Sequence, residues 1–195
     1  PVTGKAYSLA VIRGKLVAST DLGIVHCFST GEKEPFHLKP AELTPFPQKD
    51  ELARQALDST KATKGYCLFI GTKETALAAS IARLSDLKVV ISASKDEDVS
   101  KLRRDLANAG LYGNEIVVHE RNATHSFPYA DHLFNLIVNP LRNIPEGELL
   151  RLLQPRDGIA LLGQKLEKRL SKPPIEGGGE WTHLYAGPGN TACSQ

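Results

Sequence analysis

The sequence lacks an excess of charge and lacks long apolar runs. Its 24 basic residues nearly balance its 22 acidic ones, which excludes the strongly basic surface that neutralises many nucleic-acid phosphates. Apolar runs such as IALLG and YCLFIG are far shorter than the roughly 20 residues that cross a membrane as a helix. We therefore expect neither a nucleic acid nor a membrane as a partner.

Methionine is absent and cysteine is scarce. Because the chain begins at Pro1 and has no methionine, we expect either a processed start or, as the favoured explanation, a segment excised from a longer protein. The three cysteines, Cys27, Cys67 and Cys193, show no CxxC spacing and are odd in number, which argues against a zinc site and against a disulfide framework. Cys67 lies in an apolar run and is expected to be a small core residue.

The pattern of apolar residues divides the chain into four parts. Residues 1–30 alternate apolar positions between turn signals, which predicts a short β-meander. Residues 31–48 contain four prolines and predict an extended linker. Residues 49–164 alternate strand and helix patterns, whereas residues 165–195 begin with an expected short helix and a Pro/Gly-rich linker.

The alternation in residues 49–164 predicts an α/β fold with a doubly wound, mostly parallel sheet of five core strands. The expected strands are 66–70, 88–92, 115–119, 134–139 and 158–163. Helices are expected from about Lys49, from about Glu74, from a capping box of Ser94 and Glu97, and from Pro145. Such sheets bind ligands at the carboxyl ends of their strands. The candidate site residues at this edge are Gly71, Thr72, Lys73, Ala93, Ser94, Asn122 and Asn139.

The succession CLFIGTKETALAASIARL, LKVVISASKDEDV, FNLIVNPL and LLRLLQPRDGIALLG resembles a class I S-adenosylmethionine-dependent methyltransferase domain over roughly residues 50–163. The last of these segments is similar to the family's helix, Leu-x-Pro-Gly-Gly turn and strand. The resemblance implies a Rossmann-type fold, with S-adenosylmethionine as the cofactor that the candidate residues would bind.

The residues at the expected cofactor positions depart from the family's pattern. Only Gly71 remains of the Gly-rich turn, and Lys73 and Thr75 stand where the family repeats glycine. Ala93 replaces the acidic residue that normally accepts hydrogen bonds from the ribose, and Asn122 replaces the acidic residue beside the adenine. We therefore expect weak or absent cofactor binding.

Within the fourth strand, Asn135 stands where the family often has aspartate. Asn139-Pro140 is similar to the start of the Asn-Pro-Pro-aromatic motif of amino-methyltransferases, but a strand-terminating turn is the simpler explanation. Two further groups lie near the same edge. The cations Lys73, Lys95 and Arg121 are either surface charges or attract a small anion to the crevice. His119, His125 and His132 fit no zinc spacing and are expected in loops or at the rim.

The two ends of the chain resemble a different family. The opening GKAYSLAVIRGKLVASTDLGIVHCFS is similar to a blade of a PQQ-like β-propeller, and the tail EWTHLYAGPGNTACSQ is similar to the start of another blade. This implies a Rossmann-type domain inserted between blades, with the rest of a parent propeller protein as its partner. An intact quinone site needs a whole propeller, so PQQ is not expected to bind this segment. The resemblance also implies an exported bacterial protein.

The sheet edge beside strand 158–163 is expected to be open, because a short helix follows Gly163 where the family adds two strands. Residues 181–186, the opening meander or a second copy of the chain would then cover it, since an open edge favours association. Three functions stay open: a degenerate methyltransferase-like module with a structural or interaction role, an active methyltransferase, and a binder of another nucleotide or small anion. No general base stands out, which favours the first and leaves the catalytic residues unassigned.

Overall fold

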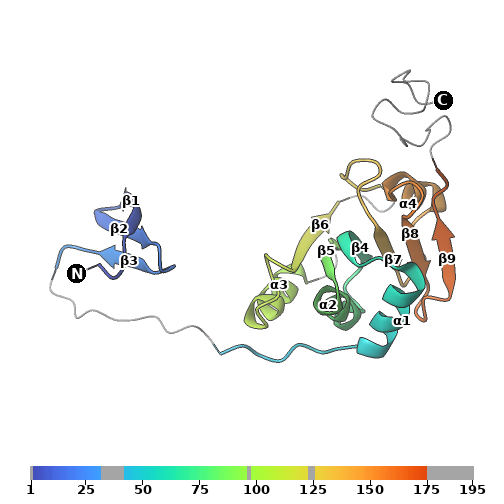
Figure 1. Cartoon of the computed structure of the whole chain (residues 1–195), viewed down its shortest axis with the longest axis horizontal. Coiled ribbons are helices and arrows are strands. Elements are labelled where there is room, and N and C mark those ends of the chain that lie inside the picture. Colours follow the sequence, from blue (N-terminus) through green and yellow to red (C-terminus); the bar gives the residue numbers. More distant parts are fainter. Residues whose placement is uncertain (1, 32–41, 96–97, 123–125, 175–195) are drawn as a thin grey trace, which may run out of the picture. The chain divides into compact units, whose positions relative to one another are not determined.

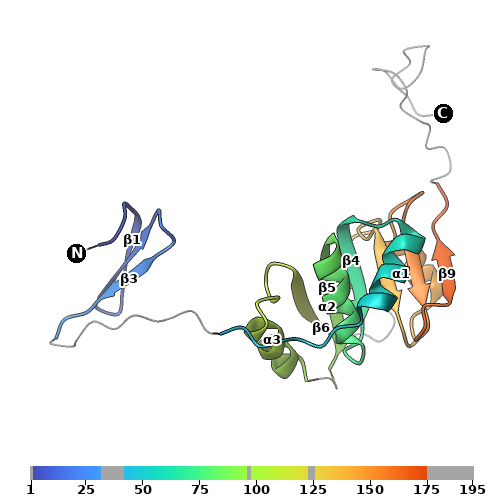
Figure 2. The same cartoon turned by 60° about the horizontal axis from the view of Figure 1, so that its bottom comes forward.

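The computed structural model describes residues 2–31, 42–95, 98–122 and 126–174, and it separates the chain into two compact units, Pro1–Pro40 and Ala41–Gln195. Each unit is described by itself (Figures 1 and 2). Within the described residues, no helix is both long enough and apolar enough to span a bilayer. The segment 181–186, expected to cover a sheet edge, lies outside the described residues.

The first unit is a three-stranded antiparallel meander, as the sequence predicted. It consists of β1 (Ala6–Ile12), β2 (Lys15–Thr20) and β3 (Val25–Phe28), in the order β1-β2-β3 (Figure 1). The first turn places Arg13 and Gly14 at positive φ, the geometry that matches the twist of a two-residue hairpin. Every residue of β1 is exposed, so the meander buries little apolar surface within its own unit.

The second unit contains a six-stranded sheet in the order β6-β5-β4-β7-β8-β9. Its strands are β4 (Lys64–Ile70), β5 (Asp86–Ser94), β6 (Ile116–Arg121), β7 (Leu136–Asn139), β8 (Ile159–Leu162) and β9 (Lys168–Ser171). The first five pair in parallel, and β9 pairs antiparallel with β8. The chain runs outward from β4 to β6 and then returns to β7 beside β4, which is the switch of direction that a doubly wound sheet requires. The predicted α/β fold is therefore confirmed.

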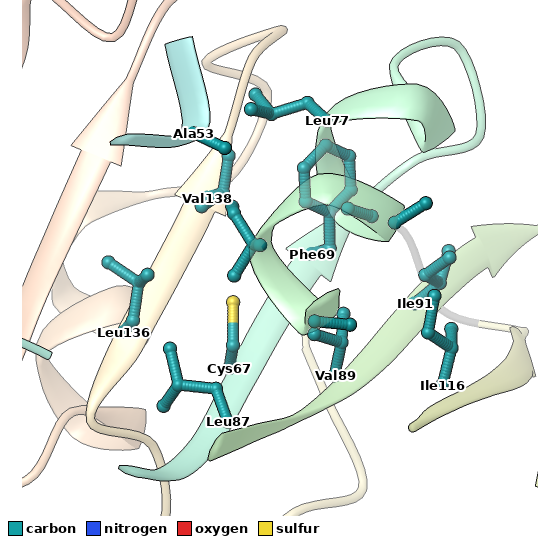
Figure 3. Packing of buried hydrophobic residues seen from close by; sticks show 14 of the residues in the cluster. Ala53, Cys67, Phe69, Leu77, Leu87, Val89, Ile91, Ile116, Leu136 and Val138 are labelled. Carbon is teal, nitrogen blue, oxygen red and sulfur yellow. The ribbon is translucent and has the colours of Figure 1, made fainter. Parts of the chain in front are cut away.

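Among the described residues, four helices cover the two faces of this sheet: α1 (Asp50–Thr60), α2 (Thr75–Leu84), α3 (Val99–Asn108) and α4 (Glu146–Leu152). Alternate residues of each strand face opposite sides, so the sheet has two separate cores. On one side, Cys67 and Phe69 of β4 pack with Ala53 of α1 and Leu77 of α2 (Figure 3). On the other side, Leu68 and Ile70 of β4 and Ile137 of β7 belong to a second core. Leu149 and Leu152 of α4 belong to the same core.

Two local predictions were wrong. The helix after β5 does not begin with a capping box at Ser94, because pairing with Arg121 of β6 extends β5 through Ser94. The N-cap of α3 is Asp98, whose Oδ1 accepts a hydrogen bond of 2.8 Å from the backbone N–H of Lys101.

The segment after Gly163 forms β9 instead of a short helix. The edge of β8 that was expected to be open is therefore paired. A strand is favoured here because its backbone forms hydrogen bonds with the edge of β8, which a helix would leave unpaired, and because Leu170 packs against the core on the α4 side. The Nη1 of Arg169 also donates to the carbonyl oxygen of Ser59 at the end of α1, at 2.9 Å.

Candidate functional site

The candidate residues from the sequence all lie at one edge of the sheet, because each of them lies at the end of a parallel strand or follows one. Strands β4, β5, β6 and β7 end at Ile70, Ser94, Arg121 and Asn139. Strands β4 and β7 are neighbours at the point where the strand order reverses. In doubly wound sheets this point is where a crevice for ligands forms.

The turn after β4 keeps the backbone shape that a glycine provides. Gly71 has a φ of +89°, in the left-handed region, and its N–H donates to the carbonyl oxygen of Ser92 at 2.9 Å. Thr72 is half-buried and Lys73 is exposed. Helix α2 begins two residues later, after Glu74, whose carboxylate pairs with the ammonium of Lys49 instead of capping the helix. The turn is therefore intact in shape, with a charged side chain beside it.

The last two residues of β5, Ala93 and Ser94, carry no carboxylate. Ala93 is fully buried and belongs to the core on the α1–α3 side of the sheet. Its methyl group packs among apolar side chains, so the position is part of the core and not of a crevice wall. Ser94, the last residue of β5, is partly exposed.

Two buried polar side chains lie on the other face of the sheet. Ser92 pairs in register with Ile70 on one side and with His119 on the other. Both amide atoms of Asn139, at the end of β7, are buried with no hydrogen-bond partner among the described residues, whereas the buried hydroxyl of Ser92 interacts with that of Tyr129. An unpaired buried group of this kind costs about 1–3 kcal/mol. Asn139 was among the predicted residues, but Ser92 was not, because a serine inside an apolar strand gives no sequence signal.

Three aromatic side chains, Phe127, Tyr129 and Phe134, pack on the face of the sheet that carries Ser92 and Asn139. The hydroxyl of Tyr129 lies 3.0 Å from Nδ1 of His119, and the Tyr129 ring meets Phe134 edge to face at 5.2 Å between ring centres. Burial raises the pKa of Tyr129 to about 12, so its hydroxyl stays protonated near neutral pH. The guanidinium of Arg121 lies 4.9 Å from the centre of the Phe127 ring, and Arg121 is only 8% exposed.

Arg151 of α4 binds the backbone of the segment 127–129, which carries Phe127 and Tyr129. Its guanidinium donates to the carbonyl oxygens of Phe127 at 3.1 Å and of Tyr129 at 2.8 Å. It also pairs with Glu148 at 2.8 Å and with Asp131 at 2.6 Å. The hydrogen bond from Arg151 lowers the pKa of the Glu148 carboxyl, so the pair is charged at neutral pH.

His119 and His132, the two of these histidines that the structure describes, have different partners. Whereas His119 contacts Tyr129, the Nδ1 of His132 lies 2.6 Å from the ammonium of Lys172. Burial lowers the pKa of that lysine. The third residue, His125, lies outside the described residues. Over the described ranges, no three histidine, cysteine or acidic side chains lie close enough together to hold a metal ion.

Asn135 has a structural place at the opposite end of the sheet from the candidate site. Its Oδ1 accepts from the N–H of Tyr66 at 3.0 Å, and its N–H donates to the carbonyl oxygen of Tyr66 at 2.9 Å. Its Nδ2 donates to the side chain of Gln154. This amide therefore joins β4 to the segment that leads into β7.

A hollow of about 420 Å³ lies beside the candidate site, on the face of the sheet that α1, α2 and α3 cover. It is bounded by residues 44–47, the start of α2 and the length of α3. Of the seven candidate residues, only Thr72 lines it.

Comparisons with known proteins show similarity of fold alone. No family model matches the chain, and no curated protein matches its sequence. One similar solved structure is a protein from Methanococcus maripaludis proposed to be an S-adenosyl-L-methionine-dependent methyltransferase, with a TM-score of 0.51 and 22% identity. The match covers 57% of this chain and 53% of that one.

Another similar solved structure is a protein from Galdieria sulphuraria proposed to be a sarcosine dimethylglycine methyltransferase, with a TM-score of 0.49 and 20% identity. This match covers 58% of the present chain and 44% of the other one. The chain thus spans about half the length of these structures. The second unit has the fold of class I methyltransferases, and its sequence is distant from both of these structures.

Proposed function

We propose that the second unit is a methyltransferase-like domain that binds S-adenosylmethionine weakly or not at all and serves as a structural or interaction module. The fold supports its descent from a cofactor-binding domain. The residues at the edge of its sheet supply few of the contacts that such a cofactor needs.

The observation that carries this proposal is the burial of Ala93. A ribose is normally held by an acidic side chain at the end of this strand, and each hydrogen bond to a charged group contributes about 1.5–3 kcal/mol. Here the side chain is a methyl group inside the core, with no exposed surface. The loss of two such bonds would weaken binding by about 3 kcal/mol or more, which is a factor of over a hundred.

The first unit supports the proposal that the chain belongs to a larger PQQ-like propeller protein. Large apolar side chains of the meander, including Leu9, Val11 and Val25, are each more than 65% exposed. A three-stranded sheet of this size is not stable in water with such apolar surfaces exposed. Packing against a neighbouring sheet on each face would bury these surfaces. The rest of a propeller would supply those neighbours, and export from a bacterial cell would follow from that membership.

Calorimetric titration of the whole chain with S-adenosylmethionine and S-adenosylhomocysteine tests the proposed loss of binding. We expect no heat of binding below millimolar ligand. Binding at micromolar strength that is lost in the Gly71→Val variant would refute the proposal, provided that circular dichroism shows the variant to be folded. Lys73→Gly is the matched variant that removes the charge beside the turn. A large gain of affinity in that variant would identify the lysine, and not Ala93, as the main obstacle.

A second candidate function, an active methyltransferase, is favoured by one observation. The amide of Asn139 is buried at the end of β7 without a partner, beside a Gly71 turn of the required shape. Such an amide can both donate to and accept from a target nitrogen. If this function is present, Asn139→Ala would abolish methyl transfer even at a saturating concentration of cofactor.

Binding of a small anion, the third candidate, has less support. Lys73 and Lys95 are exposed. Arg121, in contrast, is nearly buried against Phe127, so it adds little positive charge to the surface.

A further inference from the structure

The proposed function leaves unused the hollow beside α3 in the second unit. We call it the α3 groove. Its volume of about 420 Å³ falls in the range of small-molecule sites. It is lined by Thr44, Pro45, Phe46, Pro47, Thr72, Thr75, Asp98, Lys101, Leu102, Asp105 and Asn108.

The two long walls of the α3 groove differ in chemistry. Residues 45–47 form an apolar wall of two prolines and a phenylalanine. This wall is held at both ends, because the N–H of Thr44 donates to the carbonyl oxygen of Asn108 at 2.9 Å and the N–H of Lys49 donates to Oγ of Ser80 at 2.9 Å. The opposite wall consists of the N-cap residue Asp98 and of Lys101, Leu102 and Asp105 of α3, spaced as residues on one face of a helix.

The charges of the helical wall sum to one negative charge, from two carboxylates and one ammonium. The Nζ of Lys101 lies 2.6 Å from Oδ2 of Asp105, and this hydrogen bond raises the pKa of the lysine. The lysine and Asp105 therefore neutralise each other. Asp98 accepts a hydrogen bond from the backbone N–H of Lys101 through Oδ1, and its charge also raises the pKa of the Lys101 ammonium. One ammonium offsets only one of the two carboxylates, so one negative charge of the wall is left for a ligand.

We propose that the α3 groove binds a small organic cation, namely an amidinium, guanidinium or protonated amine carried on a flat apolar body. The cation pairs with the carboxylate of Asp98, and the flat body lies between the wall of residues 45–47 and Leu102. An anion is disfavoured by the charge of Asp98, and a neutral ligand gains only the apolar contacts. This site goes beyond the proposed function, because it uses a charge on α3 that a cofactor at the carboxyl edge would not need.

Three small probes of one shape and different charge test the proposal. Benzamidine is positive, benzamide is neutral and benzoate is negative at neutral pH. We expect saturation-transfer NMR on the whole chain to show that benzamidine binds about fivefold more tightly than benzamide and that benzoate binds least, as one partly exposed ion pair allows.

Variants locate the site. Asp98→Asn removes the charge but keeps the N-cap, because asparagine caps helices as well as aspartate does. It should weaken benzamidine about fivefold, to the level of benzamide, and leave benzamide unchanged. Asp58→Asn, which removes an exposed acid of α1, is the matched control and should change nothing.

Three results would overturn the proposal: equal binding of the three probes, no effect of Asp98→Asn on benzamidine, or no benzamidine signal at a concentration on the order of 10 mM. The titration with S-adenosylmethionine does not depend on Asp98, so the two proposals can fail separately.

Discussion

Replacing Gly65 by alanine should destabilise the second unit by forcing a methyl group into Asn135. Gly65 lies in β4 at a φ of +99°, and a Cβ there would come within 2.0 Å of Oδ1 of Asn135 and 2.7 Å of its Cγ. That oxygen accepts the N–H of Tyr66, so the amide cannot move without breaking a bond between the two segments.

Gly113 provides the matched control for backbone strain. Its φ of +93° is nearly the same, but a Cβ there would meet nothing within 4 Å. Gly113→Ala should therefore cost only the left-handed strain, about 1–2 kcal/mol. Gly65→Ala should cost that strain plus the displaced amide bond, about 1–3 kcal/mol more. The expected difference between the two variants is thus about 2 kcal/mol in the free energy of unfolding.

Urea unfolding followed by circular dichroism measures both variants, and the double variant Gly65→Ala/Asn135→Ala completes the comparison. Asn135→Ala removes the oxygen that clashes, so the double variant should cost less than the sum of the single variants by about 1 kcal/mol or more. Equal costs for Gly65→Ala and Gly113→Ala, together with strict additivity in the double variant, would refute the structural role of this amide.

Two further predictions follow from buried and paired groups. Arg151→Met should lower the free energy of unfolding by about 2–3 kcal/mol. It should also flatten the dependence of stability on pH below about pH 5, because the lowered pKa of Glu148 gives stability that is present above the unfolded-state pKa and is lost as the pH falls through the folded-state pKa. An unfolding free energy that falls as steeply with acid as in the parent protein would contradict this. In a Cys193→Ser background, Ellman's reagent should label the exposed Cys27 at once and the buried Cys67 at least roughly a thousandfold more slowly, because burial raises the pKa of the Cys67 thiol. Equal labelling rates in the folded protein would contradict the place of Cys67 in the core.

The sequence predicted the second unit well where local patterns act alone. The apolar runs of β4, β5, β7 and β8 and the helices between them were found in the right order, because a strand buried on both faces must be apolar throughout. The meander was also predicted, from alternating residues and turn signals. The prediction of a helix after Gly163 was wrong, because β9 gains its stability from the edge of β8, which lies in a different part of the sheet.

For the candidate site, the sequence by itself determined which residues follow the strands, and therefore which residue types the carboxyl edge holds. Tertiary structure alone decided what those residues do. It buried Ala93 in the core, placed Arg121 against an aromatic ring, and left the amide of Asn139 buried without a partner among the described residues. It also formed the α3 groove, from α3 and a segment about 50 residues earlier in the chain. The physical reason is that chain order and parallel pairing fix where a strand ends, whereas burial, charge pairing and cavities depend on contacts between segments that are far apart in sequence.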